Sequence, residues 1–425
     1  MLQPSFLKYK QLFELNDLSF QTKYDIINSN YVQTILPPYP SFLDKRNIKG
    51  ADSYNRYCKQ ANYVSFPNLC LKEVIGLTNR KEPKLNVPDN MSKLFDYATT
   101  QGTSILNIQN KVLESIFKFG LAGIHVHIPE NVSIANALPK LSVYAGNKII
   151  DYEQTTDEEG NKKFSYVTLD ISRYLKTKDN NYQFFKLYKV LCITKENRYC
   201  EAIVTAESYN GFDPDYPESK KNGIISITYP SWASELNFIP FVPVSKDSTT
   251  IKYGPSFIQD LIDISLQNFR LEANLCWLES NAAASHLVIK GKNLDNVSNF
   301  PVGAGAVHLL NDDSAQEYYV TPSTAGMSEI KEHIKENTAL AQDMMYSLIN
   351  ASANSSGESL KVRISTKTQD LIGLVKNIGN GITLALEMID NIINNGVNKD
   401  KIEYIPYTEF SNIEEYIGTN KEETV

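Results

Sequence analysis

Asn350-Ala-Ser-Ala-Asn-Ser-Ser-Gly-Glu-Ser-Leu-Lys-Val-Arg363 is a short polar loop that leads directly into a helix-patterned segment. Two other helical patterns precede it, Pro255–Ala284 and Ser328–Ile349, and a shorter strand-rich piece, His286–Val320, separates the two. Two long helices that carry a small knob between them form a stalk. The order therefore predicts a stalk with a strand-containing tip, followed by a flexible polar loop and a third long helix.

The first stalk helix is expected to open at Gly254-Pro255, because proline is favoured at the first helical positions. About 30 residues at a rise of 1.5 Å each give a length on the order of 45 Å. Its apolar face consists of Phe257, Ile258, Leu261, Ile262, Leu266, Phe269, Leu271 and Leu275. Within the tip, strand composition is found at Leu287–Ile289, Ala306–Leu310 and Tyr318–Val320.

The N-terminal half of the chain begins with an arm rich in aromatic residues and proline. Ser53–Leu77 then has a loose helical pattern that Pro67 interrupts, so we expect a kink or two helices. Ser104–Phe119 has a clearer pattern, since its apolar residues fall on one face and Gly120 follows where a left-handed cap is favoured. The residues of that face are Ile105, Ile108, Val112, Leu113, Ile116 and Phe117.

The region from about residue 140 to residue 245 is β-rich. Strand composition is found at Leu141–Tyr144, Phe164–Leu169, Phe184–Ile193 and Tyr199–Val204. Gly123–Pro129 predicts an alternating strand, and the acidic Thr156–Gly160 predicts the tip of a hairpin. Phe238–Val244 holds two prolines and suits an edge strand or a linker. Helices and strands together predict an α+β fold.

The composition is that of a globular protein. Of the 425 residues, 42% are hydrophobic and 21% are charged, which argues against wholesale disorder. No apolar run approaches the roughly 18 residues of a membrane helix, and the first residues lack the layout of a signal peptide. We therefore expect a soluble intracellular product with no membrane partner. The cysteines form no CxxC pair, which predicts buried free thiols.

The charge balance restricts how the chain can meet nucleic acid. Its formal net charge is −7 at pH 7. A protein that grips nucleic acid by its phosphates is usually basic. This chain therefore either does not meet nucleic acid or meets it without holding it tightly.

No catalytic motif is found along the chain. It lacks the GxxxxGK[ST] loop of ATP-driven motors and the GxSxG elbow of serine hydrolases. His125 and His127 share one face of a predicted strand. That spacing suits a metal site, but two histidines on a solvent or interface face are the more common case.

Two pairs of carboxylates are also better explained by structural roles than by catalysis or metal binding. Asp213 and Asp215 flank a proline, which favours a solvated turn over a metal site. Glu387 and Asp390 lie one turn apart on a predicted helix and favour a hydrated face over acid–base work. We expect no enzyme activity, no metal and no cofactor.

The polar loop supports two interpretations equally. Its hydrogen-bonding side chains and the basic residues after it suit loose contacts with DNA phosphates. An ordinary inter-helix loop with a serine cap explains the same residues. They are Asn350, Ser352, Asn354, Ser355, Ser356, Lys361 and Arg363. On the second stalk helix, we expect the local ion pairs Glu332–Lys335 and Lys331–Glu336.

Several stretches, in this order, resemble the portal proteins of tailed bacteriophages, and most closely a portal-like family formerly catalogued as a domain of unknown function. They are Tyr54–Ala61, Phe117–Ile124 with Pro129, Phe238–Val242 and Gly254–Gly291. Ser355-Ser-Gly-Glu-Ser-Leu-Lys361 is similar to the element that follows the tunnel loop in related portals. The resemblance extends from about Ser53 to Ile393.

The resemblance implies a portal-like subunit with a wing, a two-helix stem, a clip, a tunnel loop and a long wing helix. Residues 1–52 would form an N-terminal arm, 53–253 an α+β wing, 254–284 and 326–349 the stem helices, and 285–325 the clip. Residues 350–357 would form the tunnel loop, 358–400 the long wing or crown helix, and 401–425 a C-terminal tail. Because few residues follow the last helix, the crown would be reduced.

The resemblance also implies a function: a homo-oligomeric ring, usually a dodecamer, at one capsid vertex of the virion. Double-stranded DNA would be packaged and ejected through it with transient, non-specific contacts. The partners would be the major capsid protein, the terminase large subunit, head–tail adaptors and a scaffold, with synthesis in the host cytoplasm. Candidate contact residues are Lys331 and Lys335 in the stem channel and Asn293, Asp295, Asn296 and Asn299 at the clip. The alternative is another virion protein, such as a head–tail adaptor or a tail component.

Overall fold

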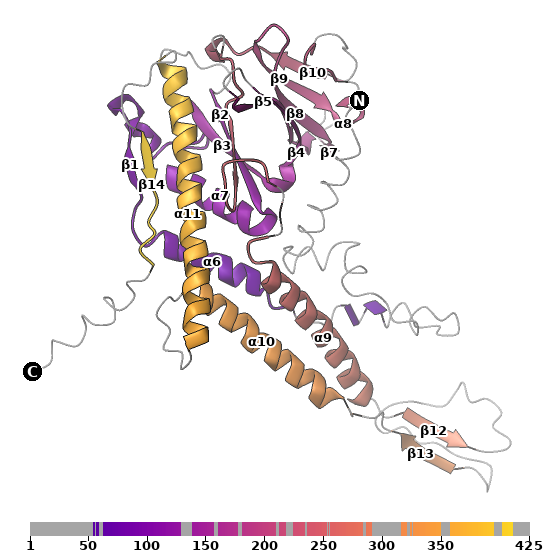
Figure 1. Ribbon diagram of the computed structural model, residues 1–425. Coiled ribbons are helices and arrows are strands. Elements are labelled where there is room, and N and C mark those ends of the chain that lie inside the picture. Colours follow the sequence, from indigo (N-terminus) through magenta and orange to yellow (C-terminus); the bar gives the residue numbers. More distant parts are fainter. Residues whose placement is uncertain are drawn as a thin grey trace, which may run out of the picture. The chain divides into compact units, whose positions relative to one another are not determined.

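The chain, in a computed structural model, divides into two compact units. The first contains Met1–Gln21, Phe66–Ile262 and Asp343–Val425, and the second contains Thr22–Ser65 and Asp263–Gln342. Figure 1 labels the elements. The structure describes residues 54–55, 57–58, 63–128, 138–156, 160–176, 181–209, 212–217, 224–233, 236–252, 254, 256–283, 286–290, 316–320, 324, 326–349, 358–394 and 402–410.

Helix α7 (Ile105–Phe119) is the central helix of the first unit. The apolar residues of its predicted face are fully buried, which confirms that prediction. Gly120 ends the helix with φ of 70°, a left-handed conformation that a residue without a Cβ adopts at little cost. Ser104 stands at the N-cap position, but its side chain makes no capping hydrogen bond.

A three-stranded antiparallel sheet packs against α7. Its central strand is β2 (Leu121–His127), between β3 (Lys140–Ala145) and β11 (Phe241–Ser245). The expected alternation along β2 is wrong, because every residue before His127 is buried. Helices α7 and α11 pack against this sheet, and aromatic residues of a second sheet contact it from β5 and β9. Strand β11 lies at the edge, as its prolines predict.

The second sheet has five antiparallel strands in the order β10–β9–β8–β5–β4. Their bounds are β4 Ile149–Thr156, β5 Lys162–Asp170, β8 Leu187–Ile193, β9 Tyr199–Thr205 and β10 Ile224–Thr228. The pairing of β4 with β5 confirms the expected hairpin, although its tip, residues 157–159, lies outside the described residues. The core of this sheet is a cluster of buried residues that includes Tyr166, Tyr188 and Val190 of its strands. Tyr209, from the helix α8 (Ala206–Tyr209) that follows β9, also belongs to this cluster.

A separate hairpin interrupts the second sheet in sequence. It consists of β6 (Arg173–Lys176) and β7 (Tyr182–Phe185), which pair only with each other. The prediction of one strand over Phe184–Ile193 is therefore wrong. That apolar run belongs to two strands, because β7 pairs with β6 whereas β8 pairs with β5 and β9.

Helix α11 (Glu358–Ile393) packs along β11, β2 and α7 in the first unit. It begins at the predicted residue but ends at Ile393, before the expected residue 400. The expected C-terminal tail also contains structure, since β14 (Glu403–Ile405) pairs antiparallel with β1 (Lys84–Asn86). Pro406 lies against Gly379 of α11, which leaves no room for a side chain at that glycine.

Shorter elements complete the first unit. Helix α6 (Phe66–Thr78) contains Pro67 in its first turn, where proline is tolerated. Residues 54–55 and 57–58 are helical and residues 63–65 are not, so the helical pattern divides before the proline, in line with the expected two helices. Among the described residues, three 3-10 helices follow: η1 (Asp89–Leu94), η3 (Gly146–Lys148) and η4 (Ser231–Ala233). None of the described helices combines the length and the hydropathy that a membrane span requires.

The second unit contains most of helix α9 (Gln259–Ala283), strands β12 (His286–Lys290) and β13 (Gln316–Val320), and most of helix α10 (Met327–Ile349). Helix α9 begins at Gln259, later than the predicted start at Pro255. The residues before it are held in a turn, because the Ser256 hydroxyl donates to the Phe117 carbonyl and accepts from the Ile258 amide. The expected strand at Ala306–Leu310 lies outside the described residues.

Candidate functional site

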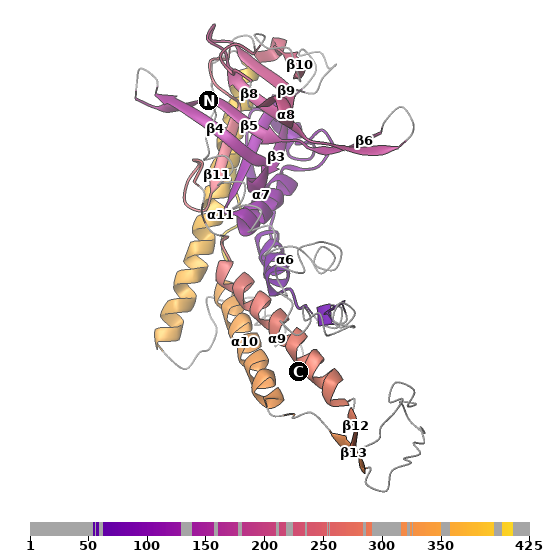
Figure 2. The same cartoon turned by 90° about the vertical axis from the view of Figure 1, so that its right-hand side faces the viewer.

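The second unit contains the pair of helices and the strands that the sequence singled out. Helices α9 and α10 lie side by side in both views, and the β12–β13 pair lies where α9 ends and α10 begins (Figures 1 and 2). The two strands are antiparallel, with His286 opposite Val320 and Lys290 opposite Gln316. We call the second-unit part of α9, β12, β13 and α10, within Asp263–Gln342, the helical arm.

Two polar contacts fix the antiparallel register of the arm helices. Asn268 Nδ2 donates to Thr338 Oγ1 over 3.3 Å, and Lys331 Nζ lies 2.9 Å from Glu279 Oε1. Asn268, in the first half of α9, thus meets the middle of α10. Glu279, near the end of α9, meets Lys331 near the start of α10. The ion pair is exposed, so we expect it to orient the helices more than it stabilises them.

Polar side chains are buried in the arm beside apolar ones such as Phe269 and Ala273. Ser265 and Asn268 of α9 are buried, and Asn337 and Thr338 of α10 are half-buried. Ser265 Oγ, Asn268 Oδ1 and Asn337 Nδ2 have no hydrogen-bond partner among the described residues. Buried polar atoms are normally paired, so these three atoms lower the stability that the apolar contacts of the arm provide.

An aromatic cluster packs residues from the N-terminal part of the chain against α9. Tyr63 packs edge-on to Phe269, with ring centroids 5.4 Å apart, and Tyr57 packs edge-on to Trp277. Tyr57 also donates its hydroxyl hydrogen to Asn274 Oδ1 over 2.9 Å. These residues, with Ala273, form a core within the second unit.

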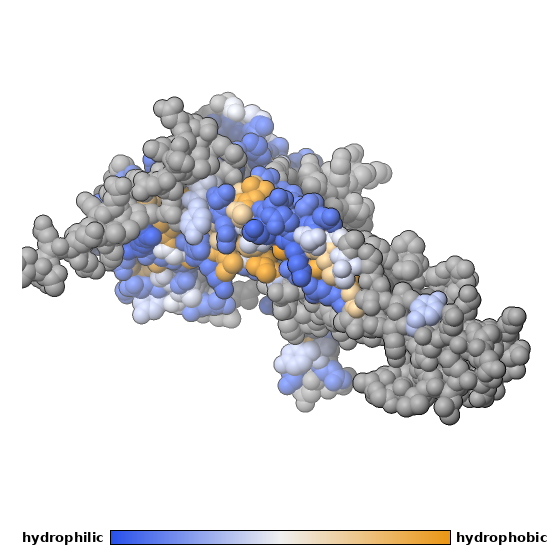
Figure 3. All heavy atoms as spheres, turned by 90° about the horizontal axis from the view of Figure 1, so that it is seen from below, coloured by the Kyte–Doolittle hydropathy of each residue, from blue (hydrophilic) through white to orange (hydrophobic). Residues whose placement is uncertain are grey.

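Lys331 and Lys335, the predicted channel-lining residues, are exposed on α10. Lys335 pairs with Glu332 at 3.6 Å, as predicted. Lys331 pairs with Glu279 and not with Glu336, because α9 brings a carboxylate closer than the next turn of α10 does. The face shown in Figure 3 is mainly hydrophilic where residues are coloured, with hydrophobic side chains in smaller groups between them.

The other predicted contact residues are only partly located. The polar loop residues Asn350, Ser352, Asn354, Ser355 and Ser356 lie outside the described residues, as do Asn293, Asp295, Asn296 and Asn299. Lys361 and Arg363 lie in the first two turns of α11, and only their backbone is described. The structure thus places both basic residues just after the polar loop.

His125 and His127 do not lie on a solvent face. His125 is 1% exposed, and its ring stacks on that of His127, with centroids 5.4 Å apart. The two rings share one side of β2, as predicted, but that side meets the five-stranded sheet. No arrangement of three or more His, Cys, Asp or Glu side chains suited to a metal occurs in the described part of the chain.

The surroundings of His125 keep it neutral. Burial holds its pKa well below the usual range, and the nearby charge of Lys189 acts in the same direction. Burial also raises the pKa of Tyr199, so this hydroxyl stays protonated and donates to Glu201 Oε1 over 2.9 Å. Its oxygen can then accept from His125 Nε2 over 3.3 Å, which favours the Nε2-protonated tautomer. Lys189 pairs with Glu201 at 2.6 Å.

The two carboxylate pairs differ from each other. Asp213 and Asp215 are exposed, and Asp213 Oδ1 accepts from the Asp215 amide, which confirms the solvated turn. The hydrated face expected for Glu387 and Asp390 is wrong. Asp390 is buried and accepts from Asn394 Nδ2 over 2.6 Å, and burial raises the pKa of the half-buried Glu387.

The cysteines are free, and Cys70, Cys192 and Cys200 are buried, as predicted. Cys58 and Cys276 are only half-buried. Both half-buried thiols belong to the second unit. The sequence alone did not indicate that these two cysteines would be partly exposed.

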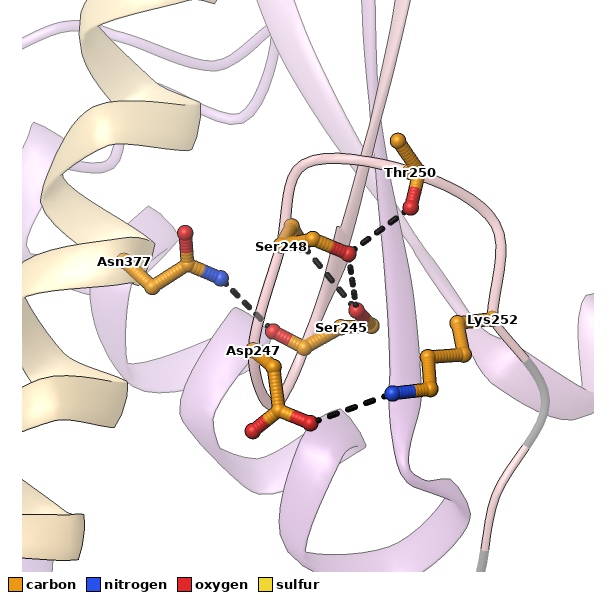
Figure 4. Close-up of polar contacts among 6 residues, drawn as sticks. All are labelled: Ser245, Asp247, Ser248, Thr250, Lys252 and Asn377. Carbon is orange, nitrogen blue, oxygen red and sulfur yellow. Dashed lines mark hydrogen bonds and ion pairs between the residues drawn. The ribbon is translucent and has the colours of Figure 1, made fainter.

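One positioning feature was not predicted from the sequence. After β11, the chain makes a compact turn in which Ser245, Ser248 and Thr250 hydrogen-bond in series (Figure 4). Asn377 of α11 donates to the Ser245 carbonyl over 2.8 Å, so the turn fixes the middle of this helix. The serine- and threonine-rich composition, Ser245-Lys-Asp-Ser-Thr-Thr250, signals a turn but not its partner.

A pocket of about 200 Å³ lies beside this turn within the first unit. Its floor is apolar and its rim carries charges of both signs. The lining residues are Lys246, Phe257, Ile258, Asp260, Leu261, Met344, Leu348 and Asp370. The Lys246 ammonium lies 5.3 Å from the centroid of the Phe257 ring, so the cation partly covers the apolar floor.

Solved structures similar to this chain include chains of gene transfer agent (GTA) particles. A chain in the neck of an empty GTA particle, computed with C6 symmetry, has a TM-score of 0.42 and 12% identity, over 84% of this chain and 85% of that one. A chain of the virion of the native GTA particle has a TM-score of 0.41 and 13% identity, over 84% of each chain.

A third similar chain, in the neck of the native GTA particle computed with C12 symmetry, has a TM-score of 0.41 and 11% identity, over 84% of each chain. TM-scores and identities this low do not establish a shared fold. No protein-family model matches the chain, and no curated protein matches its sequence.

Proposed function

We propose that this chain is the portal subunit of a tailed phage or a phage-like particle. Copies would form a ring at one capsid vertex, through which double-stranded DNA is packaged and ejected. The observation that carries the proposal is the helical arm: two antiparallel helices with a β-strand pair at one end, followed directly by a polar loop and the long helix α11. The order matches the portal resemblance of the sequence.

The arm has the features expected of a stem that needs neighbours. Between Met327 and Leu340, α10 has no fully buried residue, and Leu340 is exposed. Its half-buried residues are Met327, Ile330, Ile334, Asn337 and Thr338, a stripe narrower than the apolar face of an ordinary packed helix. A helix this poorly covered in one copy is better explained if further copies pack around it.

The charge of the arm suits a channel that lets DNA slide. Carboxylates outnumber basic groups on both helices: Asp263, Glu272 and Glu279 against Arg270 on α9, and Glu329, Glu332 and Glu336 against Lys331 and Lys335 on α10. Such a wall does not bind phosphates tightly. Screening limits the repulsion to about 10 Å at 0.1 M salt, so DNA is still able to enter.

The proposal assigns partners by position. The residues between β12 and β13 would dock the terminase large subunit during packaging and head–tail adaptors afterwards. The first unit would face the major capsid protein and a scaffold during assembly. The protein would be made in the host cytoplasm, would act without catalysis and would end in the virion.

The native mass of the purified chain, with negative-stain images of the same sample, tests the proposal. We expect closed rings with a central hole and about a dozen subunits. If the purified chain is monomeric, the same measurement is made after co-expression with its scaffold and capsid proteins. A closed dimer without a hole, or a monomer under both conditions, would overturn the portal assignment in favour of an adaptor or tail component.

A further inference from the structure

The β6–β7 hairpin carries an exposed aromatic face. Tyr174 lies opposite Phe184, and Lys176 lies opposite Tyr182, so all four side chains share one side of the strand pair. Tyr174 is 67% exposed, Tyr182 is 71% exposed and Phe184 is 52% exposed. The Tyr174 and Phe184 rings pack edge to face with centroids 5.2 Å apart. We call this side the aromatic hairpin, and we include Arg173, which precedes Tyr174 and faces the other side of the strand pair.

The hairpin makes few interactions that would stabilise it within a single copy of the chain. Its strands pair only with each other, and an isolated pair of short strands is marginally stable in water. Arg173 and Lys176 are exposed, and neither forms an ion pair with a described residue. A group of exposed aromatic side chains edged by unpaired cations is the composition of an interface.

A complementary surface lies elsewhere in the same unit. Strand β4 is an edge strand of the five-stranded sheet, so one row of its backbone groups is free to pair. Glu153 of β4 is exposed and has no basic partner among the described residues. In Figure 2 the β4–β5 hairpin and the β6–β7 hairpin point to opposite sides of the unit.

We propose that the aromatic hairpin of one copy docks on the β4 edge of the next copy. The contact joins two different surfaces, so it is the head-to-tail type from which a ring closes. Arg173 and Lys176 would pair with Glu153 across the contact, and the aromatic rings would cover the sheet edge. The inference rests on the proposed ring and names the contact that closes it.

Charge reversal tests the contact. Arg173→Glu with Lys176→Glu should weaken assembly, and so should Glu153→Lys. The variant with all three changes should regain part of the lost assembly, because the charges are complementary again. We expect the concentration at which half of the chains are assembled to rise at least about tenfold in each repulsive variant, as measured by native mass and sedimentation.

Removal of the rings tests the apolar part of the contact. Tyr174→Ser with Tyr182→Ser and Phe184→Ser should also disrupt assembly, and folding should survive because these side chains are exposed. Tyr97→Ser is the matched control, since Tyr97 is 58% exposed on another part of the first unit. It should leave assembly unchanged. Circular dichroism and a melting curve show whether each variant remains folded.

A cross-link locates the docking partner. A photoreactive phenylalanine analogue at Phe184, in a mixture of isotopically heavy and light copies, should give heavy–light cross-links to Ile149–Thr156. The inference is overturned if the reversed and serine variants assemble like the natural chain, or if cross-links form elsewhere. If the natural chain forms small oligomers that the reversals disrupt, the contact stands and the portal proposal fails. If the natural chain never self-associates, both fail.

Discussion

Tyr404 donates a hydrogen bond to Oε1 of Gln109 over 2.8 Å, and both side chains are buried. The contact joins β14, near the end of the described chain, to the central helix α7. The Tyr404 amide also donates to Thr383 of α11 over 2.9 Å. The short strand β14 therefore ties two helices of the first unit together.

Tyr404→Phe should destabilise the first unit by about 1–3 kcal/mol, because it leaves the Gln109 oxygen buried without a donor. Adding Gln109→Met should recover part of this loss, since both polar partners are then removed. Tyr407→Phe is the matched control: its hydroxyl donates to the exposed Glu409 carbonyl, and it should change stability by less than about 0.5 kcal/mol. Urea unfolding curves measure all three, and equal losses for both tyrosines would contradict the expectation.

Two glycines of α11 should respond to alanine in opposite directions. A Cβ at Gly381 would overlap Val244 of β11, whereas a Cβ at Gly373 would meet nothing within 4 Å. Gly373→Ala should stabilise the protein by up to about 1 kcal/mol through helix propensity. Gly381→Ala gains the same propensity but should lose a net 1–3 kcal/mol or so, because the helix must move off the sheet.

The comparison of unfolding midpoints decides between packing and propensity on this helix. Both variants replace glycine by alanine on the same helix, so they lower the conformational entropy of the unfolded chain equally. This contribution cancels when their unfolding midpoints are compared. A Gly381→Ala variant as stable as Gly373→Ala would show that α11 does not press on β11 as described.

Stability should fall as the pH drops below about 6.5, the ordinary pKa of histidine. Burial lowers the pKa of His125 and of His127 in the folded protein, so the unfolded chain binds protons that the folded one does not. The free energy of unfolding then decreases by up to about 1.4 kcal/mol per pH unit for each histidine, and it is level above the ordinary pKa.

His125→Asn isolates this effect, because all other titrating groups are shared with the natural chain. We expect the slope of unfolding free energy against pH, between about pH 5 and 6.5, to be smaller in the variant. The slope is read from urea curves at several pH values, so a lower overall stability of the variant does not affect it. An unchanged slope would mean that His125 is already protonated in the folded protein.

Local patterns predicted the elements that depend on local interactions. The apolar face of Ser104–Phe119 and the glycine after it sufficed to define α7, since helix periodicity and capping are both short-range. The strands of the arm and the start of α11 were found in the same way. The split of Phe184–Ile193 was missed, because the run is apolar throughout and its partners lie in different hairpins.

Long-range pairing accounts for most of the other differences. Nothing near Tyr404 indicates that Leu85, more than three hundred residues earlier, is its strand partner. His125 was expected on a solvent or interface face and Asp390 on a hydrated face, and both are buried. The ring of His125 meets Tyr199, which lies 74 residues later in the chain. For the candidate site, the sequence located the basic residues beside the polar loop, but not the partner of Lys331, which comes from α9.

Under the proposed portal function, Lys361→Ala with Arg363→Ala should reduce the DNA retained in particles several-fold while the ring stays intact. Both residues lie in the first turns of α11, directly after the polar loop, where a ring would place one pair of cations per copy beside the DNA. Each contact is weak, but many copies acting together multiply the effect. Lys72→Ala with Lys376→Ala is the control, since it removes two exposed cations from the same unit. Native mass should show the same ring for both variants, and only the first should lose DNA in a packaging assay. Equal retention by the two would remove the basis for a DNA contact at this end of α11.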